Sequence, residues 1–503
     1  MKLSYTLLWL WLSALCLWPT HALQAQKKMV DLKRADRMAF DKARSDVRIV
    51  TGNVLFEHDS ALLYCDSAVF NEVANHVEAY GNVRIRVNDT LNIFGDALFY
   101  DGKTRIARLL DNVRLVDNTT TLETPELEFD RNSKIARYER GGVIVDQRNK
   151  LVSKRGRYFT PDKQFYFRDS VRLHNPKYDI ASDTLHYNAR TELAEFFGET
   201  EIVSEENTIL CRKGWYDTRL DISSFSRRAR LLMKEQTLSG DSLYYDRKLE
   251  TGEAYRNVVM VDSAKDLIIY GQFARYEEAA GKALVIDSAQ AVIADGPDSL
   301  YLHADTLYAV FDTAGETEAL YAYYRMKFFR TDMQGMADSL SYLMKDSLIW
   351  MLGNPVLWSE EYQMNSDSIR IEMRNEKVDQ VFFLQNAFIA ALEDTHQYNQ
   401  LKGRSMTGFF RDNEMHKMKI FGNAETLYYV LEEDGSLMGI NKAVSSDITL
   451  RFRDGKIWEM VYYTQPEAVL YPPSQFPVQM RFLEGFDWKS ARRPRQAADI
   501  FRW

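Results

Sequence analysis

A unit of about 29 residues recurs along this chain, and it constrains the fold more than any other feature. Gly-Asn-Val occurs at 52–54 and again at 81–83, which places two anchors 29 residues apart. Further units begin near 111, 141, 170, 199, 228, 257 and 288, and longer ones near 325, 354, 386 and 423. Thirteen such units cannot each bury an apolar face alone, so we expect them to stack on their neighbours.

Each unit has the pattern of a bent antiparallel hairpin. Residues 82–87 alternate, with Val83, Ile85 and Val87 on one face, as in a half-buried strand. A turn signal follows at 87–89, and the next strand, 90–101, is interrupted by Gly95-Asp96, where we expect a bulge or bend. Helical periodicity is absent at length. The sequence therefore predicts an all-β fold, a V-shaped, solenoid-like stack of bent hairpins.

An Asp recurs at one position of the unit, followed two residues later by Leu and often four residues later by Tyr. It stands at 96, 183, 241, 305 and 338. A catalytic carboxylate is not needed once per repeat, whereas Asp can bond to neighbouring groups where a strand bends. We interpret the position as structural.

The ends of the chain differ from the repeats. Residues 1–25 have a positive start, an apolar run and small residues at Ala22 and Ala25, which predicts a cleavable signal peptide; an uncleaved anchor is the alternative. We expect regular repeats over 26–287, a continuation or second stack with longer repeats over 288–463, and a Pro-rich tail over 464–503. Whether the repeats form one stack or two, with a break near 288–300, stays open.

The segment 79–117, AYGNVRIRVNDTLNIFGDALFYDGKTRIARLLDNVRLVD, resembles the OstA-like repeat of the lipopolysaccharide transport proteins LptA, the periplasmic domain of LptD and, more distantly, LptC. The resemblance is clearest over 28–200 and persists weakly to 463. It implies a β-jellyroll in the periplasm whose apolar interior shelters the acyl chains of lipopolysaccharide. It also implies partnership with other jellyroll proteins by edge-strand pairing, and an association with the outer membrane. The chain is longer than LptA-like proteins and lacks room for an LptD barrel.

The inward-facing apolar positions are the candidate lipid-binding residues that this resemblance implies. A packed aromatic ladder is the alternative, because a filled core and a parted groove need the same apolar stripe. The candidates are Val83, Ile85, Leu91, Ile93, Leu98, Tyr100, Val113, Leu115, Leu127, Phe129, Leu185, Tyr187, Leu243 and Tyr245.

Other chemistry has little support in the sequence. The eight histidines stand in no metal-binding motif, and no nucleotide-binding or nucleophile signature occurs, so we expect no metal, no cofactor and no catalysis. A net charge of −8 argues against nucleic acid as a partner. Cys65 and Cys211 occupy the same place in distant repeats, so we expect two separate buried thiols. The basic clusters 226–230 and 491–495 are expected to be solvated surface rather than phosphate contacts.

Three hypotheses follow. The first is a periplasmic lipopolysaccharide-binding protein that takes part in transport to the outer membrane, and the second is a structural β-solenoid without lipid cargo. An exported enzyme ranks last, because no catalytic constellation is present.

Overall fold

The computed structural model describes residues 29–503 except 42–43, 147–148, 206, 295–297, 314–315, 376, 395, 412–413, 433 and 454–455. The expected signal peptide lies outside the described residues. The chain forms two compact units, Met1–Phe167 and Arg168–Trp503, called unit 1 and unit 2 below. The described strands within each of these units pair in antiparallel fashion, which confirms the predicted all-β fold of antiparallel hairpins.

Unit 1 is built from short antiparallel strands that follow one another along the chain. β13 (Gln164–Asn175) contains the boundary with unit 2. The strands before it are β1 (Asp31–Arg34), β2 (Arg37–Asp41), β3 (Arg44–His58), β4 (Ala61–Asn71), β5 (His76–Arg86), β6 (Leu91–Asp101), β7 (Ile106–Asp117), β8 (Thr120–Asp130), β9 (Ile135–Tyr138), β10 (Gly142–Asp146), β11 (Asn149–Ser153) and β12 (Arg155–Phe159).

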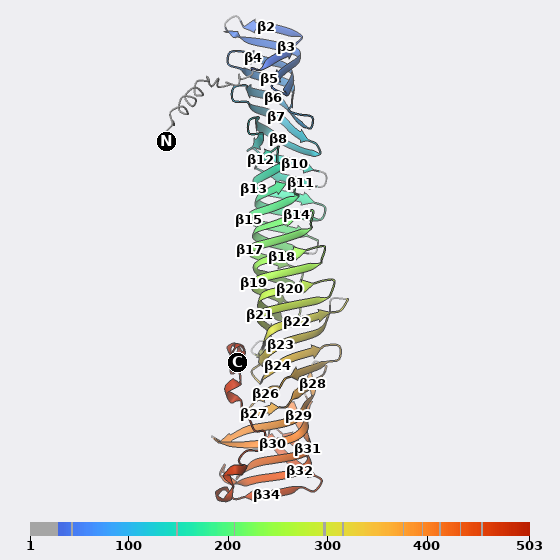
Figure 1. The fold of residues 1–503 in the computed structure, drawn as a ribbon, viewed down its shortest axis with the longest axis vertical. Helices are drawn as coiled ribbons and strands as arrows, with labels where there is room; N and C mark the ends of the chain where they lie inside the picture. The colour runs from blue at the N-terminus through green and yellow to red at the C-terminus, as the bar shows by residue number, and fades with distance from the viewer. Residues whose placement is uncertain are drawn as a thin grey trace, which may run out of the picture. The chain divides into compact units, whose positions relative to one another are not determined.

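Unit 2 continues the same hairpin pattern with longer strands near its end (Figure 1). Its strands are β14 (Tyr178–Asn188), β15 (Leu193–Ser204), β16 (Thr208–Asp217), β17 (Ile222–Leu232), β18 (Gln236–Asp246), β19 (Thr251–Asp262), β20 (Leu267–Glu277), β21 (Lys282–Ile293), β22 (Leu300–Phe311), β23 (Thr317–Phe329), β24 (Met333–Leu343), β25 (Leu348–Leu352), β26 (Val356–Ser359), β27 (Tyr362–Asn365), β28 (Ser368–Arg374), β29 (Lys377–Asp394), β30 (Gln397–Arg411), β31 (Glu414–Leu431), β32 (Leu437–Arg453), β33 (Lys456–Tyr463) and β34 (Glu467–Tyr471).

A bulge in the middle of the long strands divides the strands of unit 1, and likewise those of unit 2, into two arms. Gly81 and Asn82 of β5 both have positive φ and together oppose the single residue Asp66 of β4. Gly81 is required there, since a Cβ would lie 2.6 Å from the Asp66 carboxylate, and Asn82 donates from Nδ2 to the same carboxylate at 2.8 Å. The extra residue thus lies in the Gly-Asn strand. The recurring Asp lies opposite it in the paired strand, where the sequence had placed the bulge.

The same arrangement recurs along the chain, so the Asp position is structural as predicted. Asn112 bonds to Asp96, Asn257 to Asp241 and Asn386 to Asp367. We call the line of bulges the crease, and the turns at the free edge of each arm its rim. Arm 1 comprises the residues between a bulge and the next recurring Asp, and arm 2 comprises those from that Asp to the next bulge.

In unit 2 the strand pairing continues through the expected division at 287/288. β21 pairs with β22, and β22 with β23, each in antiparallel register. Near β24 the bulge becomes a complete break: β25 continues arm 2 from β24, while β26 continues arm 1. β29 to β32 are again continuous and bulged.

The C-terminal tail runs back along unit 2 instead of adding a repeat. In Figure 1 the red segment leaves β34 and passes beside the strands as far as β23. It contains short 3-10 helices at Pro473–Gln475, Val478–Met480, Ser490–Arg492 and Ala497–Phe501. Among the described residues no helix has the length and apolar character needed to cross a membrane.

Candidate functional site: an apolar cavity between the arms of unit 2

The interior of unit 1 is filled. Along β4 and β6, buried inward-facing residues alternate with partly buried ones, except at the two residues opposite the bulge. The buried side chains of the two arms meet. Phe56 of arm 1 packs against Phe70 of arm 2 with ring centroids 5.4 Å apart. Side chains that are buried against one another in this way make a packed core rather than a surface that a cargo chain could cover.

Ten of the predicted lipid-binding residues belong to this filled core. Each is at most 5% exposed. They are Val83, Ile85, Leu91, Ile93, Leu98, Tyr100, Val113, Leu115, Leu127 and Phe129.

Tyrosine hydroxyls hold the arms of unit 1 together. Tyr158 of arm 2 donates to the Asp117 carboxylate of arm 1 at 2.6 Å, and the Lys163 ammonium lies 3.3 Å from that carboxylate. Burial, reinforced by the hydrogen bond to Asp117, raises the pKa of Tyr158, so this hydroxyl stays a donor. We call such a contact between the arms a clasp.

A second clasp joins two residues with nearly the same separation in the sequence. The hydroxyl of Tyr100 in arm 2 lies 2.6 Å from Nδ1 of His58 in arm 1, and Arg131 donates to the same hydroxyl at 2.9 Å. The two clasps join residues 42 and 41 positions apart. Burial raises the pKa of Tyr100 as well, although the Arg131 guanidinium opposes this effect.

The clasp at Tyr158 yields a test of stability. Tyr158→Phe removes a buried bond to a charged acceptor, which contributes about 1.5–3 kcal/mol, so we expect a loss of that size in the free energy of unfolding of unit 1. Tyr166→Phe is the matched control, because its partly buried hydroxyl donates to the Gln164 side chain two residues away in the same strand. Urea unfolding of both variants checks the prediction. Equal losses in the two would contradict a special contribution from the clasp.

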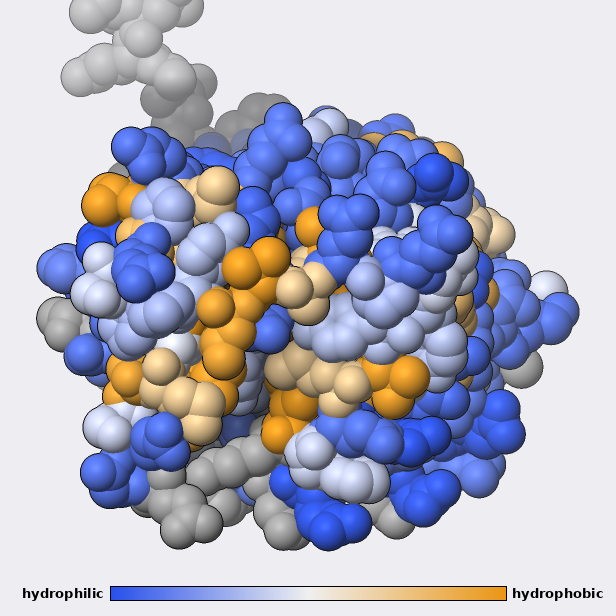
Figure 2. Space-filling model, turned by 90° about the horizontal axis from the view of Figure 1, so that it is seen from below, coloured by the Kyte–Doolittle hydropathy of each residue, from blue (hydrophilic) through white to orange (hydrophobic). Residues whose placement is uncertain are grey.

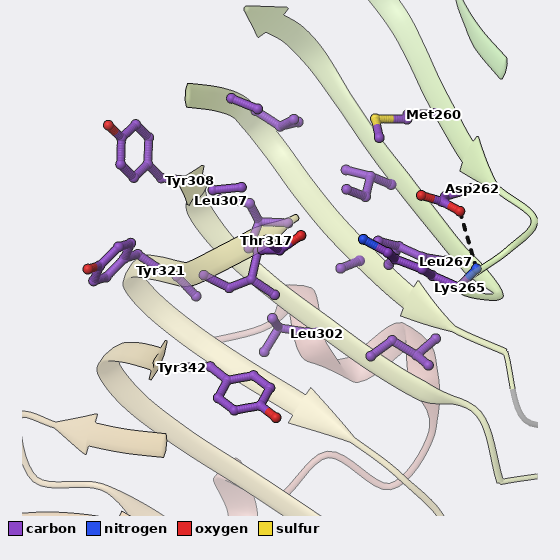
Figure 3. Close-up of a pocket in the computed structure, with 18 of the residues that line it drawn as sticks. Met260, Asp262, Lys265, Leu267, Leu302, Leu307, Tyr308, Thr317, Tyr321 and Tyr342 are labelled. Carbon is purple, nitrogen blue, oxygen red and sulfur yellow. Dashed lines mark hydrogen bonds between the residues drawn. The ribbon is translucent and has the colours of Figure 1, made fainter. Parts of the chain in front are cut away.

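Unit 2 encloses a cavity of about 2510 Å³ between its arms. Its lining reaches from His174 to Ile457, with Arg493 of the tail added at one rim. Figure 3 shows Met260 of β19, Leu302 and Leu307 of β22 and Tyr342 of β24 around this space. Figure 2 shows the end of unit 2 that carries β34, with apolar side chains gathered beside a central hollow.

Two of the four remaining predicted residues line this cavity, and two do not. Leu243 and Tyr245 line it, and their shared face confirms that the Leu and Tyr of the repeat point inward together. Leu185 is fully buried and Tyr187 partly so, and neither belongs to the lining among the described residues.

Most of the lining was missed by sequence reasoning. It includes Ile202, Ile269, Leu302, Leu320, Met351, Phe383, Met418 and Leu450. These residues occupy the same alternating positions as the core of unit 1, so period-two alternation would have found them as inward-facing without indicating an empty interior.

The lower part of the cavity rests on a packed apolar floor near the crease. Met326, Met351, Ile369, Met406, Met418 and Ile420 are all 0% exposed there. Higher in the arms the lining side chains are partly exposed, for example Leu302, Leu307 and Leu340. The floor fixes the shape of the cavity, while the walls offer apolar surface that a ligand can cover.

The rim of the cavity carries charges of both signs. In the turn after β23, Arg330 pairs with Asp332 at 2.5 Å, and near the ends of β19 and β20 Glu253 pairs with Arg275 at 2.9 Å. Polar groups therefore border the cavity, and apolar groups line its depth. Such an arrangement accepts an amphipathic ligand with its polar end at the rim.

The tail is fastened to the outer face of arm 1 by buried polar side chains. Gln363 donates to the Asp487 carbonyl and accepts from the Lys489 amide, both at 2.7 Å. Gln400 bonds in the same way to the Arg481 carbonyl and the Leu483 amide, both at 2.8 Å. Each glutamine side chain thus makes, with the tail backbone, the pair of hydrogen bonds that a neighbouring strand would otherwise make.

A lysine and an arginine complete the fastening. The ammonium of Lys327, 2% exposed, donates to the carbonyls of Arg492 and Arg502, and burial lowers its pKa. Arg493 donates to Gln334 at 2.7 Å and to the Glu360 carbonyl at 2.8 Å. The cluster 491–495, expected to be solvated surface, therefore anchors the tail through Arg493.

The cysteines are two free buried thiols, as predicted. Burial raises the pKa of Cys65 to about 12 and that of Cys211 to about 11, so both are poor nucleophiles at neutral pH. The described residues contain no cluster of His, Cys, Asp and Glu that would hold a metal ion.

Comparison with known proteins gives one family match. Residues 27–183 match the model of the family described as OstA-like protein. No curated protein matches the chain. Among solved structures, LptH from Pseudomonas aeruginosa, described as the LptA homologous periplasmic component of the conserved lipopolysaccharide transport device, is 11% identical and covers 28% of this chain and 95% of its own. The TM-score is 0.22, and an overlap this loose carries no argument about fold or function.

Proposed function

We propose that this chain binds an acylated envelope lipid of the lipopolysaccharide class and takes part in its transport. The first support for the proposal is the match of residues 27–183 to the OstA-like protein family. The cavity of unit 2 carries the proposal. Its volume of about 2510 Å³ exceeds the roughly 300–1,000 Å³ of ordinary small-molecule pockets, and its depth is apolar. Several acyl chains fit that description better than a compact metabolite.

The mechanism is burial without catalysis. Each methylene that leaves water for the apolar walls contributes about 0.8 kcal/mol, while the polar headgroup stays at the charged rim. The proposed setting is the periplasm, reached through the leader expected at 1–25, with an association at the outer membrane. Partners of the same jellyroll type would add strands at the end of unit 2, since β33 and β34 each pair with β32 alone among the described strands.

The division of labour between the units is part of the proposal. The filled interior and clasps of unit 1 favour a structural role for that unit, as a spacer or as the mounting for a partner. This retains the scaffold hypothesis for unit 1, while cargo is assigned to unit 2. The lipid-binding role proposed for Leu243 and Tyr245 follows from their place in the cavity lining.

Lipid extraction tests the proposal. The full chain, purified from a Gram-negative host, is extracted with organic solvent, and the extract is analysed by mass spectrometry. We expect acylated lipid in stoichiometric amount. After delipidation, lipopolysaccharide should displace a fluorescent fatty acid from the protein, whereas deacylated lipopolysaccharide should not, because only the acyl chains enter the cavity. A protein that yields no lipid and takes up neither probe would be a scaffold.

A further inference from the structure

An aromatic residue occupies one inward-facing position in nine of ten consecutive repeats, and the remaining repeat has an alanine between two aromatic neighbours in the row. The position lies four residues after the recurring Asp, or after the residue that replaces it, which is Pro125, Lys154, Arg212 or Gln272. In chain order it is occupied by Phe70, Tyr100, Phe129, Tyr158, Tyr187, Tyr216, Tyr245, Tyr276, Ala309 and Tyr342. Ala309 lines the cavity of unit 2, and its neighbour in the row, Tyr276, is 43% exposed.

In unit 1 this aromatic position closes the gap between the arms in two layers. Tyr100 forms the inner layer through its contact with His58. Above it, at the rims, Arg105 of arm 2 pairs with Asp59 of arm 1 at 3.2 Å. A buried clasp and an ion pair therefore lie one over the other.

At the corresponding place in unit 2, near Asp262, the described residues form the outer ion pair but no buried clasp. Asp262 of arm 1 stands five residues after Asn257, as His58 and Asp117 stand five after Asn53 and Asn112. Its carboxylate accepts from Gln236 at 2.8 Å and from the backbone amides of Ala264 and Lys265 at 3.1 and 3.2 Å. The row position that would clasp it is Ala309, which has no group that can reach across.

An ion pair between two described residues spans the arms at this place. The ammonium of Lys265, in the arm 1 turn after β19, lies 4.0 Å from the carboxylate of Glu316, in the arm 2 turn before β23. These side chains are 47% and 77% exposed, so water and salt screen their attraction. Figure 3 shows Asp262 and Lys265 on one side of the cavity, and Leu307, Tyr308 and Thr317 on the other.

We propose that this opening, bounded by Lys265, Glu316, Asp262 and Ala309 and called the mouth below, is a lateral entry for acyl chains into the cavity of unit 2. The inference rests on the proposed function and adds to it the place and the latch through which the lipid passes. The exposed ion pair opens at little cost, and the missing aromatic side chain leaves a passage beneath it. Met260, Leu302 and Leu307 line the cavity next to the mouth and give an entering chain an apolar path.

The test restores the missing aromatic residue. In Ala309→Tyr the new hydroxyl is in the repeat position from which Tyr158 reaches Asp117, so it would clasp Asp262 and close the mouth. The delipidated full chain is mixed with phosphatidylcholine vesicles that carry an anthroyloxy-labelled fatty acid, and uptake is followed by stopped-flow fluorescence. We expect uptake at least ten-fold slower than in the unsubstituted protein, with the final amplitude kept within two-fold.

Two further variants make the result specific. Val310→Tyr adds the same aromatic ring to the next residue of β22, which is outside the described cavity lining, and should take up the probe within two-fold of the original rate. Lys265→Glu replaces the attraction to Glu316 by repulsion at an exposed site, so it should speed uptake about three-fold and carries the test if Ala309→Tyr does not fold. Unchanged rates in the folded variants would overturn the mouth while leaving lipid binding intact. Failure of the unsubstituted protein to take up the probe would instead overturn the proposed function.

Discussion

Leu98→Asp should unfold unit 1, whereas Leu307→Asp should leave unit 2 folded and abolish its uptake of acyl chains. The two leucines occupy the same repeat position, two residues after Asp96 and Asp305. Leu98 is 0% exposed in the filled core, so a carboxylate there loses its water and finds no partner. We expect a loss of about 4 kcal/mol or more for this change, the range reached by buried unpaired charges.

Leu307 lines the cavity and is only partly buried, so a carboxylate at that site keeps water and costs about 1–2 kcal/mol. The water held by the new carboxylate would, however, oppose an apolar chain, and we expect binding of a fluorescent fatty acid to weaken at least ten-fold. Hydrogen exchange resolved by unit measures the first effect and fluorescence titration the second. Unfolding of unit 2 by Leu307→Asp would show that its interior is packed as tightly as that of unit 1.

The architecture was predictable because the same local pattern, a Gly-Asn pair between two alternating segments, recurs in many repeats. Gly81 and Asn82 tolerate positive φ, and alternation on either side of them requires two inward-facing strand segments. The bulge was assigned to the wrong strand of the pair, since Gly95-Asp96 also reads as an interruption. What decides between the strands is the Asn82–Asp66 hydrogen bond, and its two partners lie 16 residues apart in neighbouring strands.

The contents of the interior were not predictable from alternation. Leu98 and Leu307 occupy the same position in the repeat, yet one is enclosed and the other faces a cavity. The difference arises from the separation of the arms, to which clasps such as Tyr158–Asp117 contribute. Such contacts join residues about 41 positions apart, so the local alternation around a leucine does not reveal whether a clasp closes the arms beside it.

The tail was unpredictable for a similar reason. It follows no repeat, and the side chains that hold it are single polar residues in otherwise ordinary strands. Gln363 lies 124 residues before the carbonyl that it binds. Its sequence neighbours give no sign that the outer face of arm 1 is covered there. The burial of both faces of β26, at Val356, Leu357 and Trp358, is seen in the structure alone.

Gln363→Leu should release the tail from the outer face of arm 1. The change leaves three groups without their partner: the Asp487 carbonyl, the Lys489 amide and the Trp358 indole N–H, which now lies 3.2 Å from Gln363 Oε1. Each buried group left unpaired costs about 1–3 kcal/mol. A sum of about 3 kcal/mol would raise the population of the released tail about 100-fold.

Limited trypsin digestion measures this release, because Arg481, Lys489 and Arg492 supply cleavage sites within the tail. We expect cleavage of Gln363→Leu at least ten-fold faster than of the unsubstituted protein. Gln380→Leu is the matched control, since Gln380 lies on β29 in arm 2 and pairs there with Phe409, away from the tail. Release would also uncover the apolar residues Val356, Trp358 and Phe388 that the tail side protects, so binding of a hydrophobic dye should rise in Gln363→Leu alone. Equal cleavage rates in the two variants would mean that the apolar contacts of Leu483, Phe486 and Trp488 hold the tail without the glutamine.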